Sequence, residues 1–450
     1  MDPITHPTTT TRRKLLVIGA TGKQGRALIQ ALVSPPSAPR SHPTTTAAAA
    51  AVSADKDTKA VIVTTSEADS RVGTPSSLRP DPPTISWDIL AVTRNPSSPR
   101  AKSLLQLLPS AAAAAPETEP PSHHTISLIQ GDLDQPSTIR AIFSDHQIWG
   151  VFTVLMYPGV GKTSKMTDDT QQHIEVRQGK LVADLATEFG VDVFVYSSSL
   201  PAPLEEMSEE ERNPADGDKL ANEGYIKSLG LDRSHHGNQE GKKGLNWVII
   251  RPGFFMENLE GFLGSITVTV FREGLSEDAT LPLIATRDIG EVVSGIFRDH
   301  TRFLHKTLAI TSGTVTMRDV MAAHQRATGK PIPAIPAAVA KLLIKMNAGT
   351  RRVLKLYQLS HDARLRGNYY PEFDAQCALA RSICHLHSYE EWRRLPADGE
   401  TSSPTAVRVS VSENGRPGTA GTGTDSAATG LGFEAGWNQV SLWKLVTGRS

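Results

Sequence analysis

The segment from Lys14 to Gly25 constrains the fold more than any other part of the chain. Mostly apolar residues, Lys-Leu-Leu-Val-Ile, are followed by Gly-Ala-Thr-Gly-Lys-Gln-Gly, and apolar residues then recur at helical spacing over 27–32. This order predicts a buried strand, a tight glycine turn and an amphipathic helix. A strand and helix joined in this way are typical of the first unit of a parallel α/β sheet.

The three glycines of the turn have separate tasks. Gly19 allows backbone angles that other residues resist. Gly22 leaves room for a phosphate to approach the main chain, and Gly25 lets the helix pack closely on the strand. Helix amides and the helix dipole then face the anion. We predict that the turn cradles the pyrophosphate of a dinucleotide, with a merely structural turn as the alternative; the residues concerned are Gly19, Ala20, Thr21, Gly22, Lys23, Gln24 and Gly25.

Composition argues against several classes of protein. Lys plus Arg and Asp plus Glu both number 47, so no net field attracts nucleic acid or an anionic membrane, and we expect direct binding of neither. No run approaches the ~18 apolar residues of a membrane span. The two cysteines, Cys377 and Cys384, are too few for a disulfide framework, and we interpret them as buried helical thiols. These features favour a soluble, cytoplasmic protein without a secretion signal.

Low-complexity sequence interrupts the chain. Residues 34–88, 109–124 and 396–436 are rich in Pro, Ser, Thr, Ala or Gly and are predicted to be disordered insertions or linkers. Residues 1–13 are predicted to be a disordered N-terminus, and 396–450 a low-complexity tail. The remainder divides into a dinucleotide-binding domain over 14–250 and a smaller C-terminal lobe over 251–395 that closes the cleft.

Short apolar segments alternate with helical patterns along the remaining sequence. We predict a helix over about 171–189 that ends at Gly190 in a left-handed conformation. Alternation of this kind predicts an α/β fold, a Rossmann-like doubly wound parallel sheet with a smaller α+β lobe. The predicted strands are 14–18, 89–93, 126–129, 151–155, 193–196 and 247–250.

The choice of second strand decides the cofactor, because the residue at its end contacts the adenosine ribose. Residues 61–63 with nearby Glu67 would favour NAD(H), but no helix follows them. Residues 89–93 are followed by a turn and a helical pattern, and they place Arg94 at the strand end. A guanidinium suits a 2′-phosphate. We therefore predict NADP(H) in preference to NAD(H), with a solvated basic loop as the alternative for Arg94.

A short acidic loop follows the third strand. Asp132 is a candidate to reach the adenine amino group, and Leu133 to cover the ring. For Asp134, capping of the next helix is an equally good interpretation.

Five segments occur in one order along the chain. They are 19–25, Ala-Val-Thr-Arg-Asn-Pro at 91–96, Gln-Gly-Asp at 130–132, Val-Arg-Gln-Gly-Lys at 176–180 with the helix that leads into 195–197, and Arg-Pro-Gly-Phe-Phe-Met-Glu-Asn at 251–258. Together they resemble the NmrA-like family of atypical short-chain dehydrogenases, over about residues 12–395 apart from the insertions. The resemblance implies an NADP(H)-binding, redox-sensing regulator that acts through protein partners in the cytoplasm, and also in the nucleus.

The resemblance also implies positions for the cofactor contacts. It places the 2′-phosphate near Arg94 and Asn95 and the adenine near Asp132 and Leu133. Arg177 and Lys219 match two cofactor-facing lysines of a sensing relative, with a solvated helix charge as the alternative for Arg177. The nicotinamide side is assigned to Leu155, Met156, Tyr157, Phe255, Met256, Glu257 and Asn258. No metal is implied.

The usual proton relay is incomplete. Hydride-transferring relatives use a Tyr four residues before a Lys, but Ala215 stands four residues before Lys219. Tyr225 lies six residues beyond Lys219, about 240° around a helix. We therefore favour a regulator without this catalytic pair. The alternative is an NADP-dependent oxidoreductase that reduces a small carbonyl, enone or quinone, with the proton taken from Lys219, Tyr157 or water.

One further motif suggests a different class of protein. Gly159–Thr163 resembles the end of a nucleotide-triphosphate loop, but Met156 stands where that loop needs glycine. An NTPase is therefore the weakest interpretation. The oligomeric state is not predicted.

Overall fold

A computed structural model describes residues 11–34, 85–108, 124–155, 173–208, 217–230 and 244–396. Its centre is a seven-stranded sheet with the order β3-β2-β1-β4-β5-β6-β9, in which every neighbouring pair is parallel. The strand order reverses between β1 and β4, as in doubly wound nucleotide-binding folds. The strands are β1 (Thr11–Ile18), β2 (Ile85–Thr93), β3 (Thr125–Gln130), β4 (Gly150–Val154), β5 (Val193–Ser197), β6 (Trp247–Pro252) and β9 (Lys306–Ile310).

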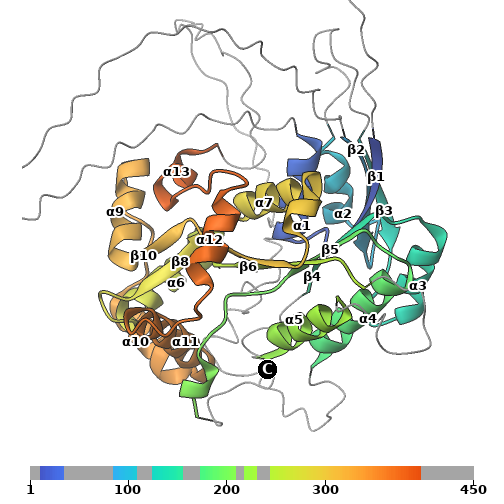
Figure 1. The fold of residues 1–450 in the computed structure, drawn as a ribbon. Helices are drawn as coiled ribbons and strands as arrows, with labels where there is room; N and C mark the ends of the chain where they lie inside the picture. The colour runs from blue at the N-terminus through green and yellow to red at the C-terminus, as the bar shows by residue number, and fades with distance from the viewer. Residues whose placement is uncertain are drawn as a thin grey trace, which may run out of the picture.

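Helices cover both faces of this sheet (Figure 1). Successive strand residues point to opposite faces, so Leu15 and Val17 join one core cluster whereas Leu16 and Ile18 join the other. The first face is packed by α1 (Lys23–Val33), α2 (Pro99–Leu105), α7 (Thr286–Arg298) and α12 (Phe373–Arg381). The second face is packed by α3 (Pro136–Asp145), α4 (Ile174–Glu188) and α5 (Asp218–Leu229).

The Rossmann-like prediction is confirmed, with differences at the strand ends. Thr11–Lys14 pair with Ile85–Asp88, so residues 11–13 and 85–88 form strands instead of the predicted disordered end and insertion. Each of these two segments extends the parallel pairing of β1 with β2. The low-complexity sequence beside each segment prevented the prediction of this extension. The helix predicted over 171–189 is observed as α4, and Gly190 follows it with φ of +67°.

The second lobe has its own small sheet and core. Its strands β7 (Phe254–Phe255), β8 (Thr280–Ile284) and β10 (Gly313–Thr316) lie in the order β10-β8-β7. A separate apolar cluster fills the space between this sheet and its helices. Those helices are α6 (Gly261–Gly274), α9 (Met317–Thr328), α10 (Ala337–Met346), α11 (Ala348–Leu365) and α13 (Tyr389–Arg394).

The chain does not remain in the smaller lobe after Arg251, contrary to the predicted boundary. β9, α7 and α12 return to the large sheet. α7 packs on α1 so closely that a Cβ at Gly290 would lie 2.4 Å from the Ala27 carbonyl oxygen. The short connecting helix α8 (His300–Phe303) and the 3-10 turns η2 (Leu204–Glu206) and η5 (Met256–Leu259) complete the described elements.

The two cysteines differ from each other. Cys377 is buried within α12, and burial raises the pKa of its thiol to about 11. Cys384 lies beyond the end of that helix and is half-buried, and burial raises the pKa of its thiol to about 12. The prediction of two buried helical thiols is therefore wrong for Cys384.

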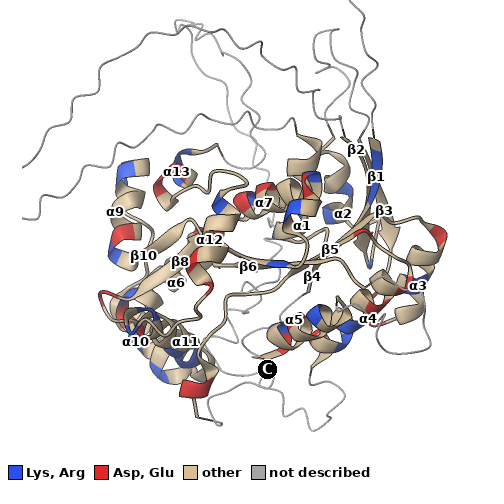
Figure 2. Ribbon diagram, viewed as in Figure 1, with Lys and Arg blue, Asp and Glu red and all other residues tan. Residues whose placement is uncertain are grey.

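Charges are mixed over the outer helices. Basic and acidic residues occur together on the same helices, for example α7 and α9 (Figure 2), in keeping with the equal totals in the sequence. In the part of the chain that the structure describes, no helix has the length and apolarity to cross a bilayer.

Candidate functional site

A cavity of about 370 Å³ lies at the carboxyl ends of the central strands. Its lining includes the residues that directly follow β1, β4, β5 and β6, namely Gly19, Leu155, Ser198 and Gly253. Open parallel sheets bind ligands at this edge, beside the point where the strand order reverses. The position therefore marks the cavity as the candidate functional site.

The glycine turn forms one wall of the cavity. Gly19 has φ of +81°, and a Cβ there would lie 2.7 Å from the Val154 carbonyl oxygen. A Cβ at Gly25 would lie 2.4 Å from the Gly19 carbonyl oxygen. Gly22 is the N-cap of α1 and supplies no side-chain hydrogen bond. The first amides of α1 thus meet the cavity without a capping side chain, which is the usual arrangement for an anion.

Most of the predicted turn residues line the cavity, and the others are buried behind it. Gly19, Thr21, Gly22, Lys23 and Gln24 line the cavity. Ala20 is fully buried in the core on the α1 face, and Gly25 is buried under the turn, so neither belongs to the lining.

Lys23 and Gln24 are the first two residues of α1, and both line the cavity. Burial lowers the pKa of Lys23, although the charges of Glu257 and Glu260 act in the opposite direction. Gln24 accepts a hydrogen bond from the Ser197 hydroxyl over 2.7 Å. This bond joins the start of α1 to the end of β5 across the switch point.

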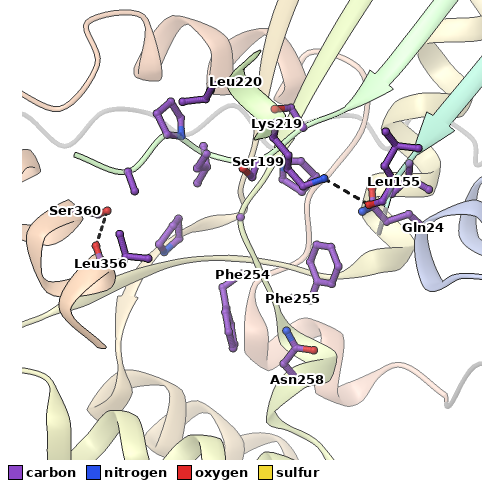
Figure 3. A pocket seen from close by; sticks show the side chains of 18 of the residues that line it. Gln24, Leu155, Ser199, Lys219, Leu220, Phe254, Phe255, Asn258, Leu356 and Ser360 are labelled. Carbon is purple, nitrogen blue, oxygen red and sulfur yellow. Dashed lines mark hydrogen bonds between the residues drawn. The ribbon is translucent and has the colours of Figure 1, made fainter. Parts of the chain in front are cut away.

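Lys219 points into the cavity from α5 (Figure 3). Its ammonium donates to Glu175 Oε1 over 2.5 Å and to the Leu155 carbonyl oxygen over 3.5 Å. Glu175 is 1% exposed, and its other oxygen, Oε2, has no hydrogen-bond partner among the described residues. The buried carboxylate therefore compensates the charge of Lys219, the lysine that the family resemblance assigns to the cofactor.

Glu175 was not predicted from the sequence. It lies in the first turn of α4, four residues before Gly179, where a Cβ would lie 2.3 Å from Asn222 Nδ2. Asn222 in turn donates to the Glu175 carbonyl oxygen over 2.9 Å. The spacing of Glu175, Gly179 and buried Val182 places all three on one face of the helix, and this pattern could have indicated from the sequence that Glu175 is buried.

The residues assigned to the adenosine side are only partly in the cavity. Arg94 lines it, whereas Asn95, Asp132 and Leu133 do not. Asn95 Oδ1 accepts from the Ser97 amide, and Asp132 Oδ1 accepts from the Asp134 amide. Leu133 packs against the core under α3 and α4. The N-cap of α3 is Gln135, so the capping interpretation of Asp134 is wrong; its side chain accepts from Gln178 Nε2.

Only two of the four residues 255–258 face the cavity. Phe255 and Asn258 line the cavity (Figure 3), and both polar atoms of the buried Asn258 amide are without a partner among the described residues. Met256 and Glu257 face elsewhere, since neither is part of the lining. Met256 belongs to the core of the smaller lobe, and Glu257 Oε1 accepts from the Thr286 amide and hydroxyl. Burial raises the pKa of Glu257.

Several residues considered from the sequence, as site positions or as rejected alternatives, lie away from the cavity or outside the described residues. Arg177 is exposed on α4 and outside the lining. Tyr225 donates to Asp184 Oδ1 on α4 and is also outside the lining. Met156, Tyr157, Ala215, the 61–63 segment and the Gly159–Thr163 motif lie outside the described residues.

The far wall of the cavity was not predicted residue by residue. It is formed by the loop after β5 and by α11, with Tyr369 beyond the end of α11. The residues from these segments are Ser199, Leu200, Pro201, Ala202, Leu204, Arg352, Leu356, Tyr357, Ser360, Arg364 and Tyr369. Among the described residues, no cluster of three or more His, Cys, Asp or Glu side chains has the spacing to hold a metal ion.

Comparisons with known proteins agree with this architecture. A search of curated proteins gave no match. Among solved structures, NmrA, a negative transcriptional regulator in complex with NAD, is 17% identical, with 85% of this chain and 95% of that chain covered at a TM-score of 0.50. Triphenylmethane reductase of Citrobacter sp., complexed with NADP(H), is 14% identical, with 85% and 100% covered at a TM-score of 0.47.

The family comparison covers most of the described structure. A model described as the NmrA-like family matches residues 85–381, from β2 through α12. This span exceeds half of the chain. The chain therefore belongs to the NmrA-like family.

Proposed function

We propose that the cavity binds NADP(H) and that the protein signals cofactor occupancy to a protein partner. The observation that carries this proposal is the pairing of Lys219 with Glu175 at 2.5 Å. In the sequence, Ala215 stands four residues before Lys219, where hydride-transferring relatives have a tyrosine. The described residues of the site include groups to hold a nicotinamide cofactor, whereas the sequence lacks the usual tyrosine partner of Lys219.

The residues present fit a dinucleotide. The glycine turn leaves no room for a side chain at Gly19 or Gly25 and presents the start of α1, as a pyrophosphate requires. The cations Lys23, Arg94 and Lys219 line the cavity, and its described lining contains no Asp or Glu. The unpartnered Asn258 amide suits a carboxamide such as that of nicotinamide. The NAD complex of NmrA, whose fold this chain shares, supports the same class of ligand.

The described groups do not replace the missing acid. In a Tyr-Lys pair the ammonium lowers the phenol pKa, but Glu175 neutralises Lys219 here. Tyr369 lines the cavity and donates its hydroxyl proton to the Pro201 carbonyl over 2.8 Å. Burial raises the pKa of Tyr369 to about 12, far from the range that favours proton transfer at neutral pH.

Residues of both lobes line the cavity. Gln24 and Lys219 come from the large sheet's helices, whereas Phe255 and Asn258 come from the segment that enters the smaller lobe. A ligand that contacts both lobes stabilises the arrangement in which both contacts are made. A partner that binds this arrangement preferentially would therefore be coupled to the cofactor.

We expect Arg94→Ala to weaken NADPH binding by roughly 10-fold to 100-fold, because a charge-assisted contact to the 2′-phosphate would be lost. NADH lacks that phosphate, so its affinity should change less than about threefold. Titration calorimetry with both cofactors measures the difference. Lys102→Ala is the matched control, since Lys102 is exposed on α2 and outside the lining. Equal loss for both cofactors, or no loss for NADPH, would contradict the assignment.

The regulatory proposal is tested with one preparation in two assays. NADPH oxidation is followed with quinones, aldehydes and enones, and a pull-down is repeated with NADP⁺, NADPH or no cofactor. We expect saturable NADPH binding, no steady oxidation, and a partner whose retention depends on the cofactor form. Steady oxidation that Lys219→Ala abolishes would establish the reductase instead.

The reductase remains a second candidate because the cavity extends beyond the cofactor cradle. Phe254, Leu356 and Tyr357 line this extension. Such an apolar space beside a nicotinamide would accommodate an organic substrate.

A further inference from the structure

The part of the cavity farthest from the glycine turn has a chemistry of its own. We call it the distal half and define it by Phe254, Pro282, Leu356, Tyr357, Arg364 and Tyr369, which all line the cavity. Leu356 and Ser360 lie at the opposite end of the view from Gln24 and Leu155 (Figure 3). Apart from Arg364, the residues that define the distal half are apolar or aromatic, and Arg352 and Ser360 of α11 add polar groups to the same wall of the cavity.

The distal half lies beside the expected position of the reactive end of the cofactor. In doubly wound folds the two halves of a dinucleotide lie on opposite sides of the switch point. Arg94, at the end of β2, marks the adenosine side. The Tyr369 hydroxyl donates a hydrogen bond to the Pro201 carbonyl oxygen. Pro201 belongs to the loop after β5, and this loop is on the nicotinamide side.

Arg364 contributes a guanidinium whose hydrogen-bond donors are only partly matched by acceptors. Its Nη2 donates to the Thr280 carbonyl oxygen over 2.7 Å, and its Cζ lies 5.3 Å from the centroid of the Tyr369 ring. The guanidinium is thus fixed on one side. Its Nη1 is buried and has no hydrogen-bond partner among the described residues.

The lining residues that the structure describes offer Arg364 no carboxylate, although the side chain of Tyr369 interacts with it. No Asp or Glu occurs among the described residues of the cavity lining, and burial lowers the pKa of Arg364. A buried charged donor without an acceptor is costly. An anionic ligand would supply both the missing acceptor and the missing charge.

We propose that the distal half binds a small organic carboxylate with a flat, apolar body, whose carboxylate accepts a hydrogen bond from Arg364 Nη1. The aromatic rings of Phe254, Tyr357 and Tyr369 suit the flat body. This inference rests on the proposed cofactor site, because the cofactor forms the other boundary of the distal half. It holds whether the carboxylate is a substrate or an effector.

The features of the distal half favour a carboxylate over the cofactor's own phosphates. Phosphate groups are bound by several convergent donors, usually with a helix N-terminus, and the glycine turn with Lys23 and Arg94 offers these at the other end of the cavity. Arg364 offers one nitrogen, Nη1, that has no acceptor among the described residues. Of the other lining residues on α11, Leu356 and Tyr357 are apolar or aromatic, and Arg352 and Ser360 are polar. One unsatisfied donor bordered by apolar side chains matches a carboxylate on a hydrophobic molecule.

The test uses trans-cinnamate and its neutral isostere trans-cinnamamide as probes of the NADPH-saturated, full-length protein. We expect cinnamate to bind at least about 10-fold more tightly than cinnamamide, the ratio of one charge-assisted hydrogen bond. Arg364→Gln should remove this preference. Arg351→Gln is the matched control, since Arg351 is exposed on the same helix and outside the cavity, and it should keep the preference.

NADPH binding, measured in every variant, separates this inference from the proposed function. If the wild-type protein fails to bind NADPH, the proposed cofactor site is wrong. If it binds NADPH but shows no preference for cinnamate, or if Arg364→Gln retains the preference, the carboxylate site is wrong. Arg364→Lys, which keeps a charge without the planar fork, serves if the glutamine variant does not fold, and it should reduce the preference without abolishing it.

Discussion

Gly25→Ala is expected to raise the Kd for NADPH by roughly 100-fold, because it displaces the turn that we assign to the pyrophosphate. A Cβ at this position would lie 2.4 Å from the Gly19 carbonyl oxygen and 2.7 Å from Ala20 Cα. Both are backbone atoms, so no side-chain rotation relieves the overlap. The free energy of unfolding should fall by about 1–3 kcal/mol, as for other overpacked cores.

A second helical glycine provides the control for this experiment. Gly224 lies within α5, and a Cβ there would meet nothing within 4 Å. Gly224→Ala should therefore stabilise the protein by about 0.5–1 kcal/mol through helix propensity alone, with NADPH binding unchanged. Thermal unfolding and calorimetry on both variants give the two quantities. Wild-type NADPH affinity in Gly25→Ala would show that the cofactor does not bind at this turn.

The large sheet was predictable because its signals are local. The strand and helix patterns around Gly19 and over 171–190 depend on residues close together in the sequence, and β1 and α4 form there. Parallel strands buried on both faces are continuous apolar runs, which survive even when long insertions separate them. The pairing of β1 with β2 across residues 35–84 is the clearest case.

The far wall of the cavity was not predictable because its contacts are non-local. Arg364 is fixed by Thr280 and Tyr369 by Pro201, pairs that are 84 and 168 residues apart in the sequence. No periodicity within α11 distinguishes a residue that packs in the lobe from one that faces the cavity. The same reason explains why Lys219 was found but its partner Glu175, 44 residues away, was not.

A family resemblance predicts which residues lie near the site more reliably than it predicts where their side chains point. Met256 and Glu257 lie between two lining residues, yet the short 3-10 turn η5 directs them into the smaller lobe and toward Thr286. Asp132 is engaged by the amide of Asp134 in its own loop. These directions depend on turn geometry, which matching residue types in order does not specify.

Removal of the Glu223 charge is expected to be among the most destabilising changes to the protein. Glu223 accepts from Arg251 Nε over 2.9 Å and Nη2 over 2.6 Å, and their side chains are 3% and 11% exposed. Burial alone would lower the pKa of Arg251, but the hydrogen bonds and charge of Glu223 raise it. Glu223→Gln leaves a buried guanidinium uncompensated, so the free energy of unfolding should fall by about 3–5 kcal/mol.

Two comparisons distinguish an unpaired buried charge from a general loss of contacts. Glu188→Gln breaks a similar two-bond pair with Arg140 that is about half exposed, and it should leave the melting temperature nearly unchanged because solvent screens that pair. The double variant Glu223→Leu, Arg251→Met should recover much of the lost stability, because neither position then carries a buried charge. If the double variant is as unstable as Glu223→Gln, the loss arises from packing and the electrostatic explanation is wrong.

The effect of Glu223 should extend to the candidate site. Glu223 lies one turn after Lys219 on α5, and its bonds to Arg251 join that helix to β6. Loss of the pair loosens the helix that positions the Lys219 ammonium against Glu175 and the Leu155 carbonyl. We therefore expect Glu223→Gln to weaken NADPH binding even at temperatures where the variant is fully folded, and the double variant to restore part of the affinity. Unchanged affinity in the folded single variant would mean that the position of Lys219 does not depend on the pair of Glu223 with Arg251.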